Sequence, residues 1–305
     1  MNKKALKSNI SLLLAAAIWG LAFVAQSDSM NYIGPFTFGT QRYLLGALAI
    51  SPVCAVTLTG IKRREGKEVL KKTVARSLGV GSICGCVLFC AATAQQIGIQ
   101  YTPAGKSGFI TALYIVLVPI FGGIFFRNKT SPGMWVSVIL AAAGLYFLCV
   151  TENFTIEKGD LWVISCAFLF AVQILLIDRY ASGTDSALFS FAQFLTVAII
   201  SAPIMLIRES IPTAEQMRGA LVPVLYTGIC SSAVAHTLQV VGQKNAENPT
   251  VAALLMSLES VFASVSGMLI LHESFSKREF AGVVIMACAV VLSQIQSGKK
   301  EKITA

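Results

Sequence analysis

Charged residues are scarce in this chain: they make up 13% of its 305 residues, whereas hydrophobic residues make up 55%. This composition leaves too little polar surface to cover one large water-soluble globule. Histidine is limited to His236 and His272, which stand apart, and neither H-E-x-x-H nor G-x-S-x-G occurs. The sequence therefore lacks the residue sets typical of a zinc protease or a serine hydrolase.

Cofactor motifs are lacking as well. The eight cysteines fall inside or at the edges of apolar runs, where they serve as small apolar fillers, and they form neither a disulfide framework nor a zinc spacing. Cys84 and Cys86 make a C-x-C pair, which is a weak metal signal. Gly105-Lys106-Ser107 is like the end of a P-loop, but Gln100 stands where that motif requires glycine. We expect no metal, no ATP and no other cofactor.

Long apolar runs fill the chain almost from end to end. A helix that crosses the hydrocarbon core needs about 20 apolar residues. The runs do not alternate apolar and polar residues, which argues against a membrane β-barrel, and the first is too long for a typical signal peptide. We expect an all-α, multi-pass integral membrane protein in the lipid bilayer, with ten transmembrane helices near 10–28, 36–59, 77–99, 104–126, 133–150, 161–178, 186–207, 220–242, 250–271 and 280–296.

The placement of lysine and arginine orients these spans, because basic residues in short loops stay on the cytoplasmic side. Most of them gather on one side if the N-terminus is cytoplasmic; few fall on the other, namely Lys158, Arg208, Arg218, Lys277 and Arg278. This asymmetry predicts a cell membrane protein with both termini cytoplasmic. The net charge of +9 is then explained by topology, and we expect no nucleic-acid partner.

Several landmarks of the first half recur in the second. The pairs are Trp19-Gly20 with Phe170-Ala171, Gln41 with Gln193, Gln96 with Gln239, and Gln100 with Gln243. We predict two repeats, 1–151 and 152–305, of five spans each. Because five is odd, the second repeat enters the membrane from the opposite side. Inverted repeats around a central cavity are typical of transporters, although channels also duplicate.

Several short motifs resemble the drug/metabolite transporter superfamily, and within it the ten-span EamA-type carriers. The resemblance covers essentially the whole chain, and its motifs are Ile18-Trp19-Gly20, Arg42, Tyr101-Thr102-Pro103-Ala104-Gly105-Lys106, Ser257-Leu258-Glu259-Ser260-Val261-Phe262 and Leu271-His272-Glu273. Ser260 departs from the family, where proline commonly follows the glutamate, which weakens any proline-hinge argument for this span. The resemblance implies alternating access around a central cavity and export of small metabolites or amino acids.

Three charged residues inside spans are candidates for the binding site. Glu259 lies about ten residues into its span, near mid-membrane, where a carboxyl is costly and needs a cavity or a partner. It is a candidate proton carrier or substrate contact; the alternative is a structural carboxyl. Lys106 lies one turn inside span four, and it either reaches the interface or supplies a counter-charge, for an anionic group or for Glu259. Arg42 contacts the substrate, makes a structural ion pair, or reaches the membrane interface from the end of its helix.

Polar and aromatic residues complete the candidate site. Gln96 and Gln239 present amides that suit a zwitterion or a neutral polar solute, with interhelical bonding as the alternative. His236 lies on the face of Gln239 and is a candidate titrating group or a packing residue. Trp19, Tyr114 and Phe170 either wall a pocket for an organic solute or pack between helices.

The sequence favours a secondary transporter that exports small organic metabolites, with amino acids among the candidates and protons as a candidate partner. A membrane-embedded enzyme and a non-carrier pore are the alternatives; we expect no enzyme, because no nucleophile and base, metal cluster or pair of carboxylates is visible. Gly81 and Gly85 form G-x-x-x-G, which permits close helix contact inside the molecule or in a homodimer.

Overall fold

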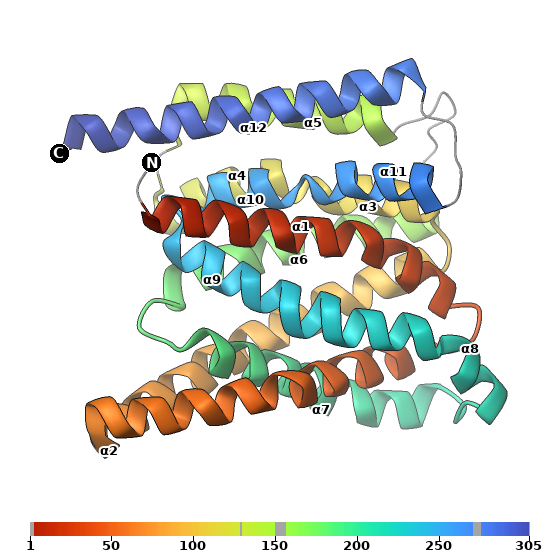
Figure 1. The fold of residues 1–305 in the computed structure, drawn as a ribbon. Coiled ribbons are helices and arrows are strands. Elements are labelled where there is room, and N and C mark those ends of the chain that lie inside the picture. The colour runs from red at the N-terminus through yellow and green to blue at the C-terminus, as the bar shows by residue number, and fades with distance from the viewer. Residues whose placement is uncertain (1–2, 129, 150–156, 271–275, 305) are drawn as a thin grey trace.

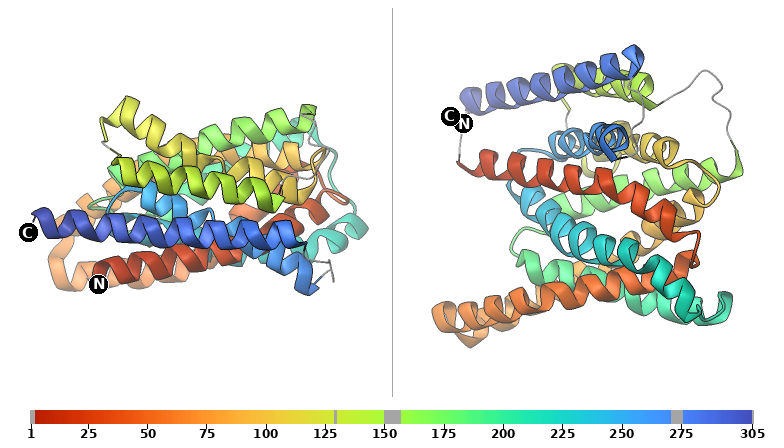
Figure 2. Two further views of the ribbon diagram at one scale, coloured as in Figure 1. Left: turned by 90° about the horizontal axis from the view of Figure 1, so that it is seen from above. Right: turned by 45° about the vertical axis from the view of Figure 1, so that its right-hand side comes forward.

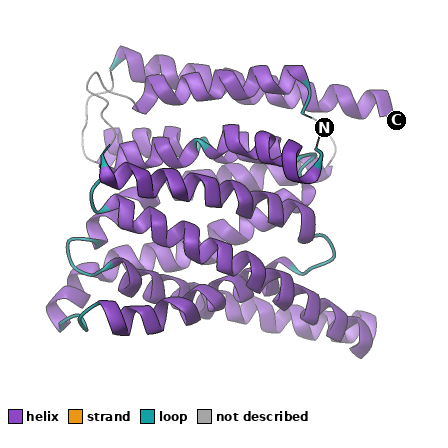
Figure 3. Cartoon of the chain, turned by 180° about the vertical axis from the view of Figure 1, so that it is seen from behind, coloured by secondary structure: helices purple, strands orange, loops and turns teal. Residues whose placement is uncertain are grey.

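The computed structural model describes residues 3–128, 130–149, 157–270 and 276–304, and these parts are helical with short connections (Figure 1). The helices are α1 (Lys3–Ser29), α2 (Pro35–Ile99), α3 (Ala104–Ala112), α4 (Tyr114–Phe126), α5 (Pro132–Cys149), α6 (Lys158–Tyr180), α7 (Ser186–Arg208), α8 (Ala214–Leu225), the π-helix η1 (Tyr226–His236), α9 (Thr237–Asn245), α10 (Pro249–Met256), α11 (Glu259–Ile270) and α12 (Lys277–Thr304). No strand occurs in the described ranges (Figure 3), which confirms the all-α prediction. The motif Leu271-His272-Glu273 lies outside the described residues.

Within the described residues, nine helical segments are long and apolar enough to cross a membrane. One of them, α2, has 65 residues and is interrupted at Gly66, where φ is +88°. A helix of that length would extend about 98 Å at 1.5 Å per residue, roughly three times the thickness of the hydrocarbon core. Its ribbon instead turns back and crosses the molecule a second time (Figure 1). The two spans expected at 36–59 and 77–99 fit this path, and the count of ten stays a prediction.

In Figure 1, α1 and α6 lie at mid-height of the bundle, α1 toward the viewer and α6 behind it, and the view from above in Figure 2 shows them on opposite faces. At one side α5 packs along α12, and at the opposite side α2 packs along α7 and α6. Between these pairs, α1 contacts η1, α9, α10 and α11. The first residues of α1 and the last of α12 lie at the same end of the bundle, which we call the terminal end; the other end is the distal end (Figure 1).

The outer faces of the bundle are apolar. Val56, Ile124, Phe125 and Ile207 expose more than half of their side chains. Exposed apolar surface of this extent would be unfavourable in water and matches lipid. The interior, in contrast, contains polar residues such as Arg42 and Glu259. This distribution is typical of a membrane protein whose polar groups face an internal cavity.

Gly81 and Gly85 are used inside the molecule, where α2 packs against α7. A Cβ at Gly81 would lie 2.6 Å from the Phe189 carbonyl oxygen, and one at Gly85 would lie 2.8 Å from Thr196 Cβ. Glycine is required at such distances because no real Cβ approaches so closely. The G-x-x-x-G motif therefore joins two helices of one chain and gives no support to a homodimer.

Two of the spans are interrupted near their middle. Leu113 separates α3 from α4, and Ser257 with Leu258 separates α10 from α11. At both breaks the backbone bonds shorten to three residues: Leu113 N–H donates to the Ile110 oxygen at 3.2 Å, and Leu258 N–H to the Leu255 oxygen at 3.3 Å. The second break occurs without a proline at position 260. Interrupted helices are a common way for transporters to aim helix ends and side chains at a binding site.

Candidate functional site

A small cavity lies among the central helices, with a volume of about 50 Å³. Six of the eight residues predicted to bind substrate line it: Trp19, Arg42, Tyr114, His236, Gln239 and Glu259. They come from α1, α2, α4, η1, α9 and α11, so residues distant in sequence converge on one space. Their roles in binding stay predictions. Gln96 and Lys106 are not among the lining residues.

Glu259 and Tyr114 meet across this cavity. Glu259 is the first residue of α11 and Tyr114 the first of α4, so each follows directly on a helix break. The Tyr114 hydroxyl donates to Glu259 Oε1 at 3.2 Å, and both side chains are buried. The contact joins the two interrupted spans directly.

Arg42 lines another part of the cavity and is 5% exposed. Its Nε donates to Ser232 Oγ at 3.0 Å, one terminal nitrogen to Gln26 Oε1 at 2.8 Å, and the other to Ser231 Oγ at 2.9 Å. The Tyr43 ring lies 5.1 Å from the guanidinium carbon. These partners are neutral, so the structural ion pair considered as one alternative for Arg42 is not formed with any described residue.

His236 is buried at the end of the π-helix η1. Its Nδ1 lies 2.8 Å from the Ser231 carbonyl oxygen, which accepts only, so Nδ1 carries the hydrogen and Nε2 is an acceptor in the neutral ring. Trp19 packs edge-on at 5.0 Å between ring centres and also donates its indole N–H to the Ser231 oxygen at 3.2 Å. Three aromatic rings thus hold His236, since Tyr43 and Phe194 also pack edge-on against it. π-Helical segments recur at functional sites, where they change the direction of side chains.

The predicted glutamines bond between helices. Gln96 Nε2 donates to the Gln26 carbonyl oxygen at 3.0 Å, so Gln96 supports the wall of the cavity from behind. Gln239 Nε2 donates to Gln173 Oε1 at 3.4 Å, and Gln243 Nε2 to the Ile174 oxygen at 3.0 Å. The alternative of interhelical bonding therefore describes Gln96 and Gln243, whereas Gln239 both bonds and lines the cavity.

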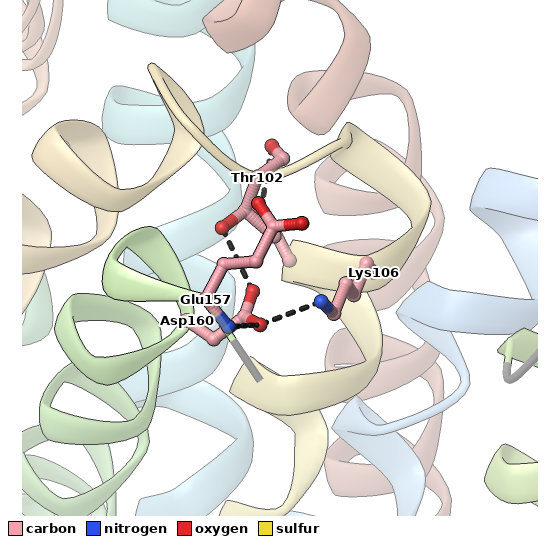
Figure 4. A network of polar contacts seen from close by, with 5 residues as sticks. Thr102, Lys106, Glu157 and Asp160 are labelled. Atoms are coloured by element: carbon pink, nitrogen blue, oxygen red, sulfur yellow. Dashed lines mark hydrogen bonds and ion pairs between the residues drawn. The ribbon is translucent and has the colours of Figure 1, made fainter. Parts of the chain in front are cut away.

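Lys106 lies at the distal end of the bundle, where its Nζ pairs with Asp160 Oδ2 at 2.5 Å (Figure 4). Asp160 is 1% exposed; it also accepts from Thr102 Oγ1 at 2.9 Å and from the Glu157 N–H at 2.8 Å. We call Thr102, Lys106, Glu157 and Asp160 the distal network. A Cβ at Gly159 would lie 2.6 Å from Thr102 Oγ1, so the start of α6 touches the turn between α2 and α3. Lys106 thus supplies a counter-charge to Asp160, a carboxylate that sequence reasoning did not single out.

Other lining residues were not predicted. They are Ala22, Phe23, Gln26, Tyr43, Gln95, Thr111, Gln173, Ile174, Ser231 and Met256. Phe170, which the sequence suggested as an aromatic wall together with Trp19 and Tyr114, lines the cavity as well. Gln26 follows Trp19 by seven residues, two helical turns, so helical periodicity places both on one face. No feature of the sequence pointed to Ser231, whose place on the cavity wall follows from its position in the π-helix η1.

A second cavity of about 100 Å³ lies toward the terminal end. Its lining includes Val118, Asn128, Thr250 and Gln296, from the connection after α4, the start of α10 and the end of α12. Val118 follows Tyr114 by one helical turn on α4. The two cavities are therefore separated by about one turn of an interrupted helix.

Long apolar helices packed round a small polar cavity are the architecture of a membrane transporter. The chain matches the model of the EamA-like transporter family over residues 6–150 and 157–294. It belongs to this family and is a multi-pass membrane transporter of the drug/metabolite type.

Individual relatives agree with this assignment. The chain is 28% identical over 293 residues to an uncharacterized transporter of Archaeoglobus fulgidus, covering 96% of this chain and 87% of the other. It is 19% identical to the uncharacterized transporter YoaV of Bacillus subtilis, covering 97% and 99%. One solved crystal structure superimposes with a TM-score of 0.72 at 15% identity, covering 96% and 98%, which shows a shared fold.

Proposed function

We propose that the protein is a secondary transporter that exports small organic metabolites, with amino acids among the candidates, across the cell membrane by alternating access. The observation that carries this proposal is the central cavity, which holds a carboxyl (Glu259) and a guanidinium (Arg42) and adjoins both helix breaks. A cavity of about 50 Å³ favours a small solute.

The proposed topology has both termini in the cytoplasm, so the distal end faces outward and the terminal end inward. The two repeats, 1–151 and 152–305, would enclose the solute between them. The family model matches the chain in two segments that lie on either side of this boundary, which supports the division. Export then requires the distal network to open, because it ties α3 of the first repeat to α6 of the second.

Glu259 is the proposed proton carrier or the contact for a cationic group of the solute. A buried carboxyl that meets a tyrosine hydroxyl can exchange that hydrogen bond for one to a solute. If the group gains and loses a proton during the cycle, solute flux becomes coupled to the pH gradient. Tyr114→Phe would remove the hydroxyl partner while leaving the carboxyl in place.

The test is Glu259→Gln in proteoliposomes, screened against amino acids and other metabolites with and without a pH gradient. The amide keeps the shape and removes the titration, so we expect flux per folded molecule to fall at least tenfold and to lose its pH dependence. Glu209→Gln is the matched control, since Glu209 caps α2 through the N–H groups of Phe36 and Thr37 (both 2.8 Å) and lies outside the cavity. The control should change the melting temperature more than the flux.

Wild-type flux at every pH from Glu259→Gln would remove this assignment. The same screen distinguishes the two alternative functions, a membrane-embedded enzyme and a non-carrier pore. An enzyme would convert the solute instead of moving it, and a pore would conduct without saturation.

A further inference from the structure

Arg42 is a buried cation that the described residues do not neutralise. It is 5% exposed on a helix that faces the middle of the bundle, and its hydrogen-bond partners are two serine hydroxyls and one glutamine oxygen. A charged group in such surroundings is costly and is normally found opposite an ion or a substrate. Lys106 differs, because it already pairs with Asp160.

The guanidinium also has donors to spare. Arginine carries five N–H groups in a fixed plane, and its three described side-chain bonds use three of them, one on each nitrogen. Two donors therefore remain, one on each terminal nitrogen, and the residue lines the central cavity. Two N–H donors on one guanidinium can bind the two oxygens of a carboxylate, which is the group that arginine recognises best.

A second donor on the cavity wall is unsatisfied. Gln173 is 1% exposed and its Oε1 accepts from Gln239, whereas its Nε2 has no hydrogen-bond partner in the part of the chain that the structure describes. A buried donor without an acceptor costs about 1–3 kcal/mol until an acceptor arrives. The cavity wall therefore holds one further donor, besides those of Arg42, that a solute oxygen can satisfy.

We infer that Arg42 binds the carboxylate of the exported solute, while Gln26, Ser231 and Ser232 hold the guanidinium flat against the cavity. This inference rests on the proposed transport function and names the chemical class of its substrate: a small organic acid or amino acid. The Tyr43 ring beside the guanidinium restricts its tilt and so fixes the direction from which a carboxylate approaches.

The experiment compares flux for solutes that differ only in the anionic group. Proteoliposomes containing the full chain are tested with L-alanine and L-alaninamide, lactate and lactamide, L-leucine and L-leucinamide, and methyl phosphate. We expect the carboxylates to move at least tenfold faster than their amides, and methyl phosphate to move poorly. Equal rates for acid and amide, or preference for methyl phosphate, would overturn the inference while leaving the transporter in place.

Two variants then assign the preference to Arg42. Arg42→Gln should reduce carboxylate flux at least tenfold, but loss of so many bonds can also impair folding. Gln26→Glu keeps the shape and places a carboxylate 2.8 Å from an Arg42 nitrogen, where it occupies the guanidinium from within the protein. This variant should retain its melting temperature and lose carboxylate flux at least tenfold.

Gln41→Glu is the charge-matched control, because Gln41 precedes Arg42 on α2 and does not line the cavity. It should transport at the wild-type rate. Carboxylate flux that survives unchanged in folded Gln26→Glu would show that Arg42 is structural and would refute the inference. If the wild-type protein moves no solute of any class, the proposed transport function itself is refuted. This outcome differs from transport without preference for carboxylates, which refutes only the role of Arg42.

Discussion

The distal network makes a sharp prediction, because the buried carboxylate of Asp160 on α6 joins Lys106 on α3 and so ties the two proposed repeats together at this end of the bundle. In Asp160→Asn the Lys106 pair loses its charge, while the amide still fits the space at the start of α6. The single amide oxygen can accept from the Glu157 N–H in the place of Oδ2, while the Thr102 hydroxyl, which donates to Oδ1 of Asp160, can turn and accept from the amide NH2, so the change is confined mainly to the ion pair. We expect the distal end to open more often.

The magnitude follows from burial. Breaking a buried ion pair by removing one partner costs about 3–5 kcal/mol, but Lys106 is 18% exposed and can turn toward water, which lowers the estimate to about 2 kcal/mol. If the pair exists only in the closed state, this energy shifts the equilibrium between closed and open states by roughly 30-fold.

The assay follows access to the central cavity from outside. Thr111 lines the cavity. In a chain without its native cysteines, the rate at which a membrane-impermeant maleimide labels Thr111→Cys therefore measures access to the cavity. Labelling should accelerate by tens of fold in Asp160→Asn. Thr250 lines the second cavity, toward the terminal end. Labelling of Thr250→Cys from the inner side should slow in Asp160→Asn if access alternates.

Asp178→Asn is the matched control, because Asp178 lies on the same helix at its opposite end. It should leave the labelling of Thr111→Cys unchanged. The gate would be refuted if folded Asp160→Asn is labelled at the wild-type rate at both positions. Faster labelling at both ends together would indicate general loosening instead of a gate.

The remaining predictions concern topology and packing. Maleimide added outside should label cysteines placed at 152–158 and not those at 62–72, and the reverse pattern would invert the proposed orientation. Gly85→Ala should lower the free energy of unfolding by about 1–3 kcal/mol, since its Cβ would meet Thr196 Cβ at 2.8 Å. Gly79→Ala is the control and should be neutral or slightly stabilising, because nothing lies within 4 Å of its Cβ. Equal melting temperatures for the two variants would contradict this packing.

The fold was largely predictable because membrane helices obey a local rule. A run of about 20 apolar residues identifies a span without knowledge of any other segment, and the expected ranges match the described helices closely. The exception is α2, where two predicted spans form one helical element across Gly66. Breaks inside spans were not predictable from composition: the one at Ser257–Leu258 arises without proline or glycine.

The site was predictable where a costly residue stood alone in an apolar run. Glu259 and Arg42 are expensive wherever they lie in a membrane, so their identity alone indicated an internal position. The hydrogen-bond and ion-pair partners of the charged residues were not predictable, because Lys106 meets Asp160, and Arg42 meets Ser231 and Ser232, across long sequence separations. Asp160 fell just outside the predicted span at 161–178 and so carried no expected cost.

Glu259 and Arg42 are held in the cavity in the same way. Each is buried and bonded to neutral groups, so neither forms an ion pair with the described residue that it contacts. If the two formed an ion pair with each other, a solute would have to break it before binding. Separate hydroxyl and amide partners instead hold each group in place with bonds that are weaker than those to a charged solute group. A site built in this way stays ordered without substrate and still leaves the strongest interactions for the solute to form.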